Sequence, residues 1–199
     1  MADHYYSNRP DAESAPAVIK HTGRGHHMTL ETDRGVFSKS GVDFGSRLLI
    51  EAFEAPTIEG DFADIGCGYG PIGLSLAKDF PERQIHMVDV NERAVALAQK
   101  NAERNGVQNV RIDASDGMEN VPSGLAAVIT NPPIRAGKET IFKFYKEARE
   151  RLVSGGDLWV VIQKKQGAPS TKEFLEGLYN EVDVVEKVKG YWILKAKKY

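Results

Sequence analysis

The sequence has few of the features that would place a protein in a membrane or outside the cell. It contains a single cysteine, Cys67, so no disulfide can form within the chain, and a reducing compartment is expected. No apolar run approaches the roughly 20 residues that a membrane-spanning helix needs. The N-terminus, Met-Ala-Asp-His-Tyr-Tyr, lacks the basic and apolar regions of a secretory signal. The sequence therefore predicts a cytoplasmic protein that does not contact a membrane.

Neither sign of charge is in strong excess. The 26 Lys and Arg residues nearly balance the 28 Asp and Glu residues, so the net charge is −2 and no global basic footprint for nucleic acid exists. Local basic clusters do occur, at Lys164-Lys165, at Lys187 and Lys189, and at Lys195, Lys197 and Lys198. These clusters fit two interpretations equally, solvated strand ends or a face that contacts RNA. The 41% of hydrophobic residues is ordinary for a globular domain with a buried core.

The N-terminal part is polar and carries little periodicity. The first 26 residues include Pro10 and Pro16 and predict an irregular lead-in. Residues 27–38 alternate around Asp33-Arg-Gly and predict a small β-hairpin with its turn there. Asp43 is expected to cap a helix through residues 47–53. We therefore divide the chain into an N-terminal extension, residues 1–28, and one domain, residues 29–199.

A repeated alternation of strands and helices fills the rest of the chain. Strands are expected at residues 61–65, 84–88, 109–112, 125–130 and 158–163, with helices at 72–80, 92–105, 139–152 and 171–179. Two further strands, 182–188 and 191–196, are separated only by Lys189-Gly190, so they must pair antiparallel, because a parallel crossover needs a dozen or more residues. The predicted fold is α/β: a Rossmann-like, seven-stranded, mostly parallel sheet with helices on both faces and a C-terminal antiparallel hairpin.

A glycine-rich turn follows the first of these strands. Gly66, Gly68 and Gly70 would let a ligand approach the backbone, and the following helix N-terminus favours an anion. From Gly68 the residues match the dinucleotide fingerprint G-x-G-x-x-G, and Asp89 lies about 20 residues further on, where it could bind a ribose. This pattern alone fits an NAD-type cofactor, S-adenosylmethionine (SAM) or a purely structural turn.

Three features favour SAM over a dinucleotide. Asp64, two residues before the first glycine, would repel a pyrophosphate but suits the α-ammonium group of SAM, through water or backbone. The terminal antiparallel hairpin is foreign to the six-parallel-strand dehydrogenase sheet. The fourth strand ends in Asn131-Pro-Pro, which the dehydrogenase interpretation does not explain. The sequence therefore predicts a SAM site.

These motifs resemble those of a known superfamily. The residues Asp64-Ile-Gly-Cys-Gly-Tyr-Gly70 resemble motif I of class I SAM-dependent methyltransferases. The resemblance implies cofactor contacts by Asp64, Gly66, Cys67, Gly68, Tyr69 and Gly70. Val88-Asp89-Val90-Asn91 is similar to the acidic loop for the ribose, which implies that Asp89 and Val90 bind SAM. Ser115-Asp116 is similar to the pair that meets the adenine.

Two further segments resemble a particular family, the bacterial small-subunit ribosomal RNA guanine-N2 methyltransferases. Residues 35–49, Gly-Val-Phe-Ser-Lys-Ser-Gly-Val-Asp-Phe-Gly-Ser-Arg-Leu-Leu, are similar to the region before motif I in that family. Asn131-Pro-Pro-Ile-Arg-Ala-Gly-Lys138 is similar to its catalytic loop. The resemblance extends from about residue 35 to the end. It implies methylation of ribosomal RNA with SAM. Known members carry a second methyltransferase-like domain, so we expect recognition here by the N-terminal segment and basic clusters, or by a homodimer.

The Asn131-Pro-Pro loop explains the reaction type. Methyl transfer from a sulfonium mainly requires alignment of the two reactants, and an exocyclic amino group is a poor nucleophile because its lone pair is delocalised. The Asn131 side-chain oxygen and the Pro132 carbonyl can accept both N–H bonds and direct the lone pair at the methyl group, while Pro132 and Pro133 stiffen the loop. Asn131 is also expected at the cofactor. No general base and no metal are required. The competing interpretation is a simple turn after a strand.

Substrate contacts are less specific. Where relatives carry an aromatic residue, this chain has Ile134, which packs against a base but cannot stack on it. Arg135, Lys138 and Lys164 could meet substrate phosphates or be ordinary loop charges, and Phe37 could close over the cofactor or pack beneath it.

Three functional hypotheses remain on these residues. The first is methylation of guanine N2 in small-subunit ribosomal RNA. The second keeps the enzyme class but changes the acceptor, to a protein glutamine, adenine N6 or a small amine. The third is a SAM-binding assembly factor without catalysis. A metal site at His26-His27 is disfavoured, because neighbouring strand residues point apart.

Overall fold

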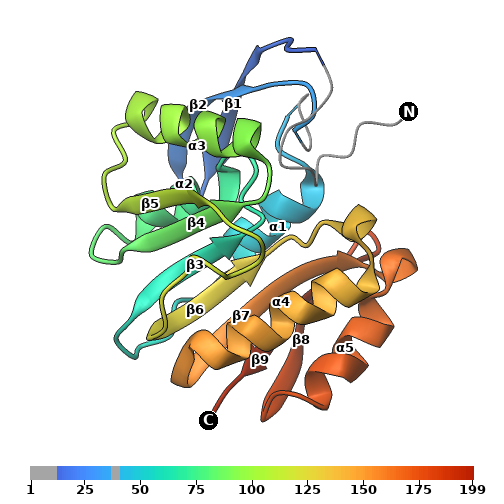
Figure 1. The fold of residues 1–199 in the computed structure, drawn as a ribbon. Helices are drawn as coiled ribbons and strands as arrows, with labels where there is room; N and C mark the ends of the chain where they lie inside the picture. The colour runs from blue at the N-terminus through green and yellow to red at the C-terminus, as the bar shows by residue number, and fades with distance from the viewer. Residues whose placement is uncertain (1–12, 37–40) are drawn as a thin grey trace.

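The computed structural model describes residues 13–36 and 41–199. Its main feature is a seven-stranded sheet in the order β5-β4-β3-β6-β7-β9-β8 (Figure 1). The strands are β3 Asp61–Ile65, β4 Ile85–Asp89, β5 Val110–Ala114, β6 Leu125–Thr130, β7 Leu152–Gln163, β8 Glu181–Val188 and β9 Tyr191–Lys197. Strands β3 to β7 are parallel, and β9 lies antiparallel between β7 and β8. This confirms the predicted Rossmann-like sheet with its C-terminal hairpin.

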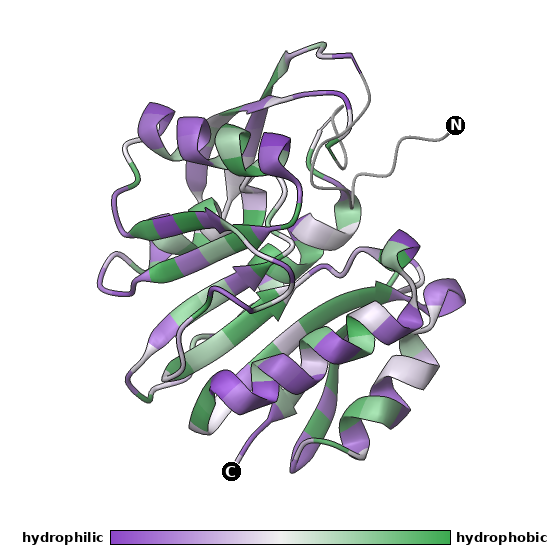
Figure 2. Cartoon of the chain, in the orientation of Figure 1, coloured by the Kyte–Doolittle hydropathy of each residue, from purple (hydrophilic) through white to green (hydrophobic). Residues whose placement is uncertain are grey.

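Helices cover both faces of the sheet. They are α1 Phe44–Ala52, α2 Pro71–Asp79, α3 Glu92–Arg104, α4 Lys138–Arg151 and α5 Ala168–Glu176, with short 3₁₀ turns at Ile134–Ala136 and Lys164–Gln166. One hydrophobic cluster joins α1, α2 and α3 to one face, and a second joins α4 and α5 to the other (Figure 1). Strand β6 serves both clusters, since Ile129 faces the first and Val128 the second. Figure 2 shows the apolar central strands between helices whose outer faces carry polar residues.

The C-terminal hairpin follows the predicted geometry. Val188 pairs with Tyr191, so the turn contains only Lys189 and Gly190, with φ of 50° and 81°. Positive φ at both central residues gives a turn whose twist matches that of the flanking strands. Strand β7 begins at Leu152, six residues before the expected start at 158. Leu152 already pairs with Leu125 of β6, and after a register shift that includes Gly155, with φ of 87°, pairing resumes between Asp157 and Ala127. Helix α5 begins three residues early, with Pro169 in its first turn.

The prediction for the N-terminal hairpin was wrong. Strand β1, Ala17–Gly23, pairs antiparallel with β2, His26–Thr32, around Arg24-Gly25. The expected irregular lead-in over 26 residues therefore contains a strand, and Asp33-Arg34-Gly35 follows the hairpin rather than closing it. Only His21 and Gly23 of β1 are buried, so its apolar alternation is too weak to be seen in the sequence. Arg24, with φ of 52°, stands where asparagine or glycine usually signals such a turn.

The hairpin is part of the main hydrophobic core. Met28 and Leu30 are buried in the same cluster as α1, α2 and α3. Residue 28, where we place the end of the N-terminal extension, lies within β2, and the division at this residue stays a prediction. Within residues 13–36 and 41–199, the structure has no helix that is long and apolar enough to cross a membrane.

Candidate active site

The main cleft lies at the carboxyl ends of β3, β4 and β6. Strand order changes direction between β3 and β6, and ligands of open α/β sheets bind at such a switch point. The space between its walls, open solvent included, is about 640 Å³. Its lining comes from the glycine-rich turn, from Asp89 and Asn91 after β4, from Asn131, Pro132 and Pro133 after β6, and from Val36, Asp43 and Ser46 on the N-terminal side.

The glycine-rich turn leaves space for a ligand. Gly66, Gly68 and Gly70 have φ of 71°, 56° and 107°, a region that favours glycine. A β-carbon at Gly68 would meet no atom within 4 Å, so this position faces the open cleft. At Gly70, by contrast, a β-carbon would lie 2.9 Å from a Leu74 methyl carbon. The first glycines therefore keep the backbone accessible, and the third allows the turn to pack on α2.

Asp64 lies behind this turn rather than in the cleft lining. Its side chain is 1% exposed, and its Oδ2 accepts a hydrogen bond from the Gly73 amide at 2.9 Å, in the first turn of α2. Burial raises the pKa of Asp64 to about 7. Its Oδ1 is buried and has no hydrogen-bond partner in the described part of the chain. Asp64 thus positions the helix below the turn and keeps one carboxylate oxygen unsatisfied.

Asp89 connects the turn to the cleft. Its Oδ2 accepts from the Gly68 amide at 2.9 Å and its Oδ1 from the Asn91 amide at 2.8 Å. The Val90 amide also donates to this carboxylate, so three backbone amides orient it and one of its four lone pairs remains for a ligand hydroxyl. Burial raises the pKa of Asp89 to about 6. Val90, which follows, lies outside the cleft lining.

The predicted adenine-contacting pair lies one loop further along the edge. The Ser115 hydroxyl donates to the Gly117 carbonyl at 3.0 Å and accepts from the Asn120 amide at 3.1 Å, so it shapes its own loop. Asp116 is exposed, and its carboxylate lies 4.0 Å from the Lys143 ammonium. Neither residue lines the main cleft. Their contact with adenine stays a prediction.

Asn131 is held in one orientation by the start of α1. Its Nδ2 donates to Asp43 Oδ2 at 3.1 Å and to Ser46 Oγ at 2.9 Å. Asp43 also caps α1 by accepting from the Ser46 amide at 3.1 Å, as the sequence predicted. Because both amide hydrogens are directed at these acceptors, the Asn131 side-chain oxygen remains available as an acceptor in the cleft wall.

The Asn131-Pro-Pro loop also touches the glycine-rich turn. Thr130 Oγ1 donates to the Ile65 carbonyl at 2.9 Å, which joins the end of β6 to the end of β3. A β-carbon on Gly66 would lie 3.9 Å from Pro133 Cδ. Both prolines are buried, so the loop start is rigid. The predicted catalytic loop and the predicted cofactor turn therefore form adjacent walls of one cleft.

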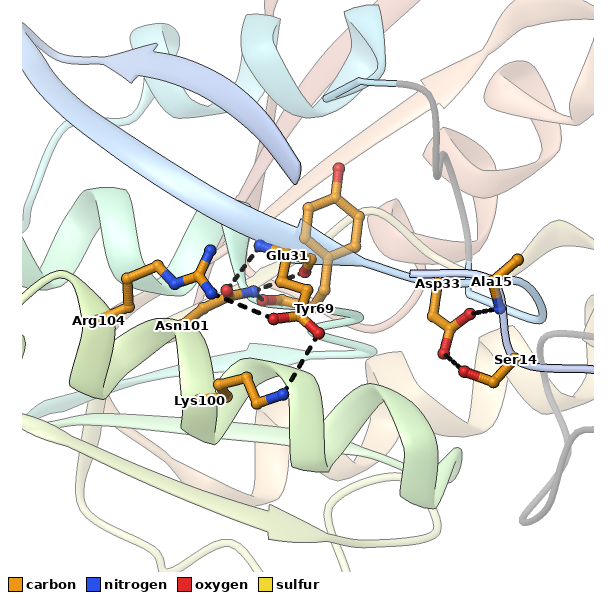
Figure 3. Close-up of polar contacts among 8 residues, drawn as sticks. All are labelled: Ser14, Ala15, Glu31, Asp33, Tyr69, Lys100, Asn101 and Arg104. Carbon is orange, nitrogen blue, oxygen red and sulfur yellow. Dashed lines mark hydrogen bonds and ion pairs between the residues drawn. The ribbon is translucent and has the colours of Figure 1, made fainter. Parts of the chain in front are cut away.

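The sequence interpretation missed residues that support this cleft from the N-terminal side. Asn101 of α3 donates to the carbonyls of Glu31 and Tyr69, at 2.9 and 2.8 Å, and accepts from the Glu31 amide at 2.8 Å (Figure 3). It thereby connects β2 to the glycine-rich turn. Asn91 Nδ2 similarly donates to the Gly35 carbonyl at 2.8 Å. Ser46 was missed too. The only sequence signal for it was the segment around residues 35–49.

The remaining predicted site residues that the structure describes do not line the main cleft. Phe37 lies outside the described residues. Ile134 is half-buried and lines a separate hollow with Lys138 and Phe142, between the catalytic loop and α5. Arg135, Lys138 and Lys164 are exposed. Their substrate contacts stay predictions.

Cys67 and the N-terminal histidines carry no evident chemistry. Cys67 lines the cleft but is buried, and burial raises the pKa of its thiol, so the thiol stays protonated and is a weak nucleophile. His26 contacts Asp79 at 3.1 Å, whereas His27 contacts the Thr22 hydroxyl at 2.8 Å. Among the described residues, no group of three or more His, Cys, Asp or Glu side chains is arranged to hold a metal ion.

Comparison with known proteins identifies the family. The methyltransferase small domain family matches residues 27–195. An uncharacterized Bacillus subtilis protein, YbxB, is 56% identical over the full length of both chains. Ribosomal RNA small subunit methyltransferase C of Vibrio cholerae is 31% identical over 179 residues, which are 88% of this chain and 51% of that protein.

A solved structure of the same kind has a similar fold. The T. thermophilus 16S rRNA N2 methyltransferase RsmC, in complex with AdoMet and guanosine, superposes with a TM-score of 0.82 at 26% identity. The match covers 96% of this chain and 52% of that one, so the chain spans about half the length of these ribosomal RNA methyltransferases. The chain therefore belongs to the methyltransferase small domain family and is a methyltransferase with a Rossmann-like fold.

Proposed function

We propose that this methyltransferase transfers a methyl group from SAM to the exocyclic amino group of guanine, N2, in small-subunit ribosomal RNA. The observation that carries the proposal is the orientation of Asn131, whose amide hydrogens are engaged by Asp43 and Ser46. The similarity to RsmC, with one of its structures in complex with AdoMet and guanosine, supports the choice of cofactor and base. SAM supplies an electrophilic methyl group on a sulfonium.

The residues of the cleft fit this cofactor. Gly66 and Gly68 leave the backbone of the turn open to a ligand. The Asp89 carboxylate, oriented by backbone amides, lines the cleft and can accept a hydrogen bond from a ribose hydroxyl. The Asp64 carboxyl, whose Oδ1 has no partner among the described residues, lies behind the turn, and a ligand with a cationic ammonium and sulfonium would favour its ionised form.

The catalytic loop suits an amino acceptor. The Asn131 side-chain oxygen and the Pro132 carbonyl can each accept one N–H of an amino group, which removes the lone pair from conjugation with the base and directs it at the methyl group. The nitrogen forms a bond to the methyl carbon while the carbon–sulfur bond breaks. The methylated nitrogen is briefly cationic and therefore acidic, so its proton passes to water without a dedicated base. The chain's contribution is alignment and electrostatics.

The test is methyl transfer to ribosomal subunits. Purified protein is incubated with labelled SAM and with small subunits that lack guanine-N2 methylation, and the RNA is digested for nucleoside mass spectrometry. We expect N2-methylguanosine from the wild type and formation slower by about 10²-fold or more from Asn131→Ala, which should still bind SAM. Label on protein or on adenine N6 would instead identify one of the other acceptors. SAM binding without any transfer would favour a non-catalytic assembly factor.

A further inference from the structure

Charge along the carboxyl edge of the sheet changes sign at Asn131. On the side of β3, β4 and β5, the residues that end or follow the strands include Asp64, Asp89 and Asp116. On the other side, the segments 131–139, 163–167 and 188–191 contain one carboxylate, in Glu139, and five cations: Arg135, Lys138, Lys164, Lys165 and Lys189. A chain with a net charge of −2 therefore presents a locally basic edge.

The two ends of this basic edge are joined by the backbone. The Lys164 amide donates to the Gly190 carbonyl at 2.8 Å, which holds the end of β7 against the turn between β8 and β9. A surface hollow lies here, with Lys164, Lys165, Lys189 and Tyr191 in its lining. All three lysines are exposed.

Within the described part of the chain, these three lysines are not neutralised by a carboxylate. Among the described residues, no carboxylate lies within ion-pair distance of any of them, whereas Lys100 pairs with Glu31 and Lys172 with Glu176. Unpaired cations gathered on one hollow favour an anionic partner. Residues 13–36 and 41–199 thus leave three lysine charges unpaired on the same side of the sheet edge as the Asn131-Pro-Pro loop.

The floor of the hollow is aromatic and rigid. The Tyr191 ring lies 5.4 Å from the Phe44 ring, and the Tyr191 hydroxyl accepts from Gln163 Nε2 at 2.6 Å. Lys189 Nζ lies 5.1 Å from the centroid of Phe44. Phe44 immediately follows Asp43, which holds Asn131, so the start of α1 contacts both Tyr191 of the hollow and Asn131 of the cleft. Cations next to aromatic rings are typical of surfaces that bind single-stranded nucleic acid.

We propose that Lys164, Lys165 and Lys189 form a track for the phosphodiester backbone of single-stranded RNA next to the methylated nucleotide. This inference rests on the proposed function and adds the path of the substrate. The cationic cofactor and the anionic strand approach Asn131 from opposite halves of one sheet edge, each against side chains of opposite charge. Of the two interpretations of the basic clusters, the proposal therefore chooses an RNA-contacting face for Lys164-Lys165 and Lys189.

The test uses a triple variant with a matched control. Lys164→Ala, Lys165→Ala and Lys189→Ala are combined, and the control combines Lys78→Ala, Lys100→Ala and Lys146→Ala, helix residues with the same total charge change. Binding of a fluorescein-labelled single-stranded oligoribonucleotide is measured by anisotropy at several salt concentrations. The logarithm of the association constant falls as the logarithm of the salt concentration rises, and loss of three phosphate contacts should make this slope less steep by about 2. The control should keep the wild-type slope, and both variants should keep the wild-type affinity for SAM.

The outcomes separate this proposal from the proposed function. Equal slopes for the track variant and the wild type, while the wild type methylates RNA, would overturn the track alone. A wild type that binds SAM but neither binds nor methylates RNA would overturn both. If the triple variant melts below the wild type, the single substitutions Lys165→Ala and Lys189→Ala replace it, and each should lower the slope by about 0.7.

Discussion

Ser46→Ala removes one of the two acceptors that hold the Asn131 amide. The hydroxyl oxygen of Ser46 lies 2.9 Å from Asn131 Nδ2, and the residue is 4% exposed, so water has little access to replace it. A net hydrogen bond of this kind contributes about 1 kcal/mol. If that energy serves to keep the Asn131 oxygen directed at the amino group of the substrate, its loss lowers kcat by about fivefold.

The assay is single-turnover methyl transfer at saturating SAM and RNA. Ser46→Ala should lower the rate of transfer while the Kd for SAM stays within twofold of wild type. Asn131→Ala, which removes the acceptor itself, should lower the rate by about 10²-fold or more, comparable to the loss of one preorganised polar group. The larger effect belongs to Asn131 because Asp43 still holds its side chain in the serine variant.

Ser75→Ala is the matched control. Ser75 is also buried in a helix, and its hydroxyl donates to the Pro71 carbonyl without contacting Asn131. It should lose stability without losing rate. The reasoning is refuted if Ser46→Ala transfers methyl groups at the wild-type rate while Asn131→Ala is inactive, because the orientation of Asn131 would then not depend on Ser46.

Three further predictions concern the cofactor turn and its support. Gly68→Ala places a β-carbon in the open cleft at a φ of 56°, so it should cost about 1 kcal/mol of stability and weaken SAM binding at least tenfold in calorimetry. Asn101→Ala removes three hydrogen bonds to the backbone of Tyr69 and Glu31 and should lower the free energy of unfolding in urea by about 2–3 kcal/mol. The pKa of Asp89 is raised to about 6, so its charging destabilises the apo fold as pH rises from about 4 to above 6. Affinity for SAM should rise over the same range, and Asp89→Asn should reduce both pH dependences; an unchanged pH profile in that variant would contradict the assignment.

Much of the fold could be predicted from local pattern alone. Three elements have the expected bounds to within a residue: the strands Asp61–Ile65 and Leu125–Thr130, and the helix capped by Asn91. Their bounds could be predicted because consecutive residues show the apolar pattern of a buried strand or the polar cap of a helix. The β1–β2 hairpin could not be predicted, because its exposed strand and its Arg24-Gly25 turn carry weak local signals. Its place is decided by long-range contacts, such as that of Asn101 with Glu31.

The residues of the candidate site also fall into those that the sequence could indicate and those that it could not. The glycines and Asn131-Pro-Pro could be recognised because the chemistry requires those residue types at those spacings. Asp43 was recognised only as a helix cap, and Ser46 not at all, since their contact with Asn131 joins residues 88 and 85 positions apart.

The sequence by itself determined that this chain forms an α/β sheet with a glycine-rich turn and an Asn-Pro-Pro loop. The turn and the loop follow from the sequence because both depend on local backbone geometry. Only the tertiary structure decided that Asp64 lies behind the turn while Asp89 faces the cleft. It also decided that β9 lies between β7 and β8, which brings the Lys189 turn to the edge where Lys164 follows β7. The physical reason is that the packing of distant strands and helices, rather than local spacing, decides which charges share an edge.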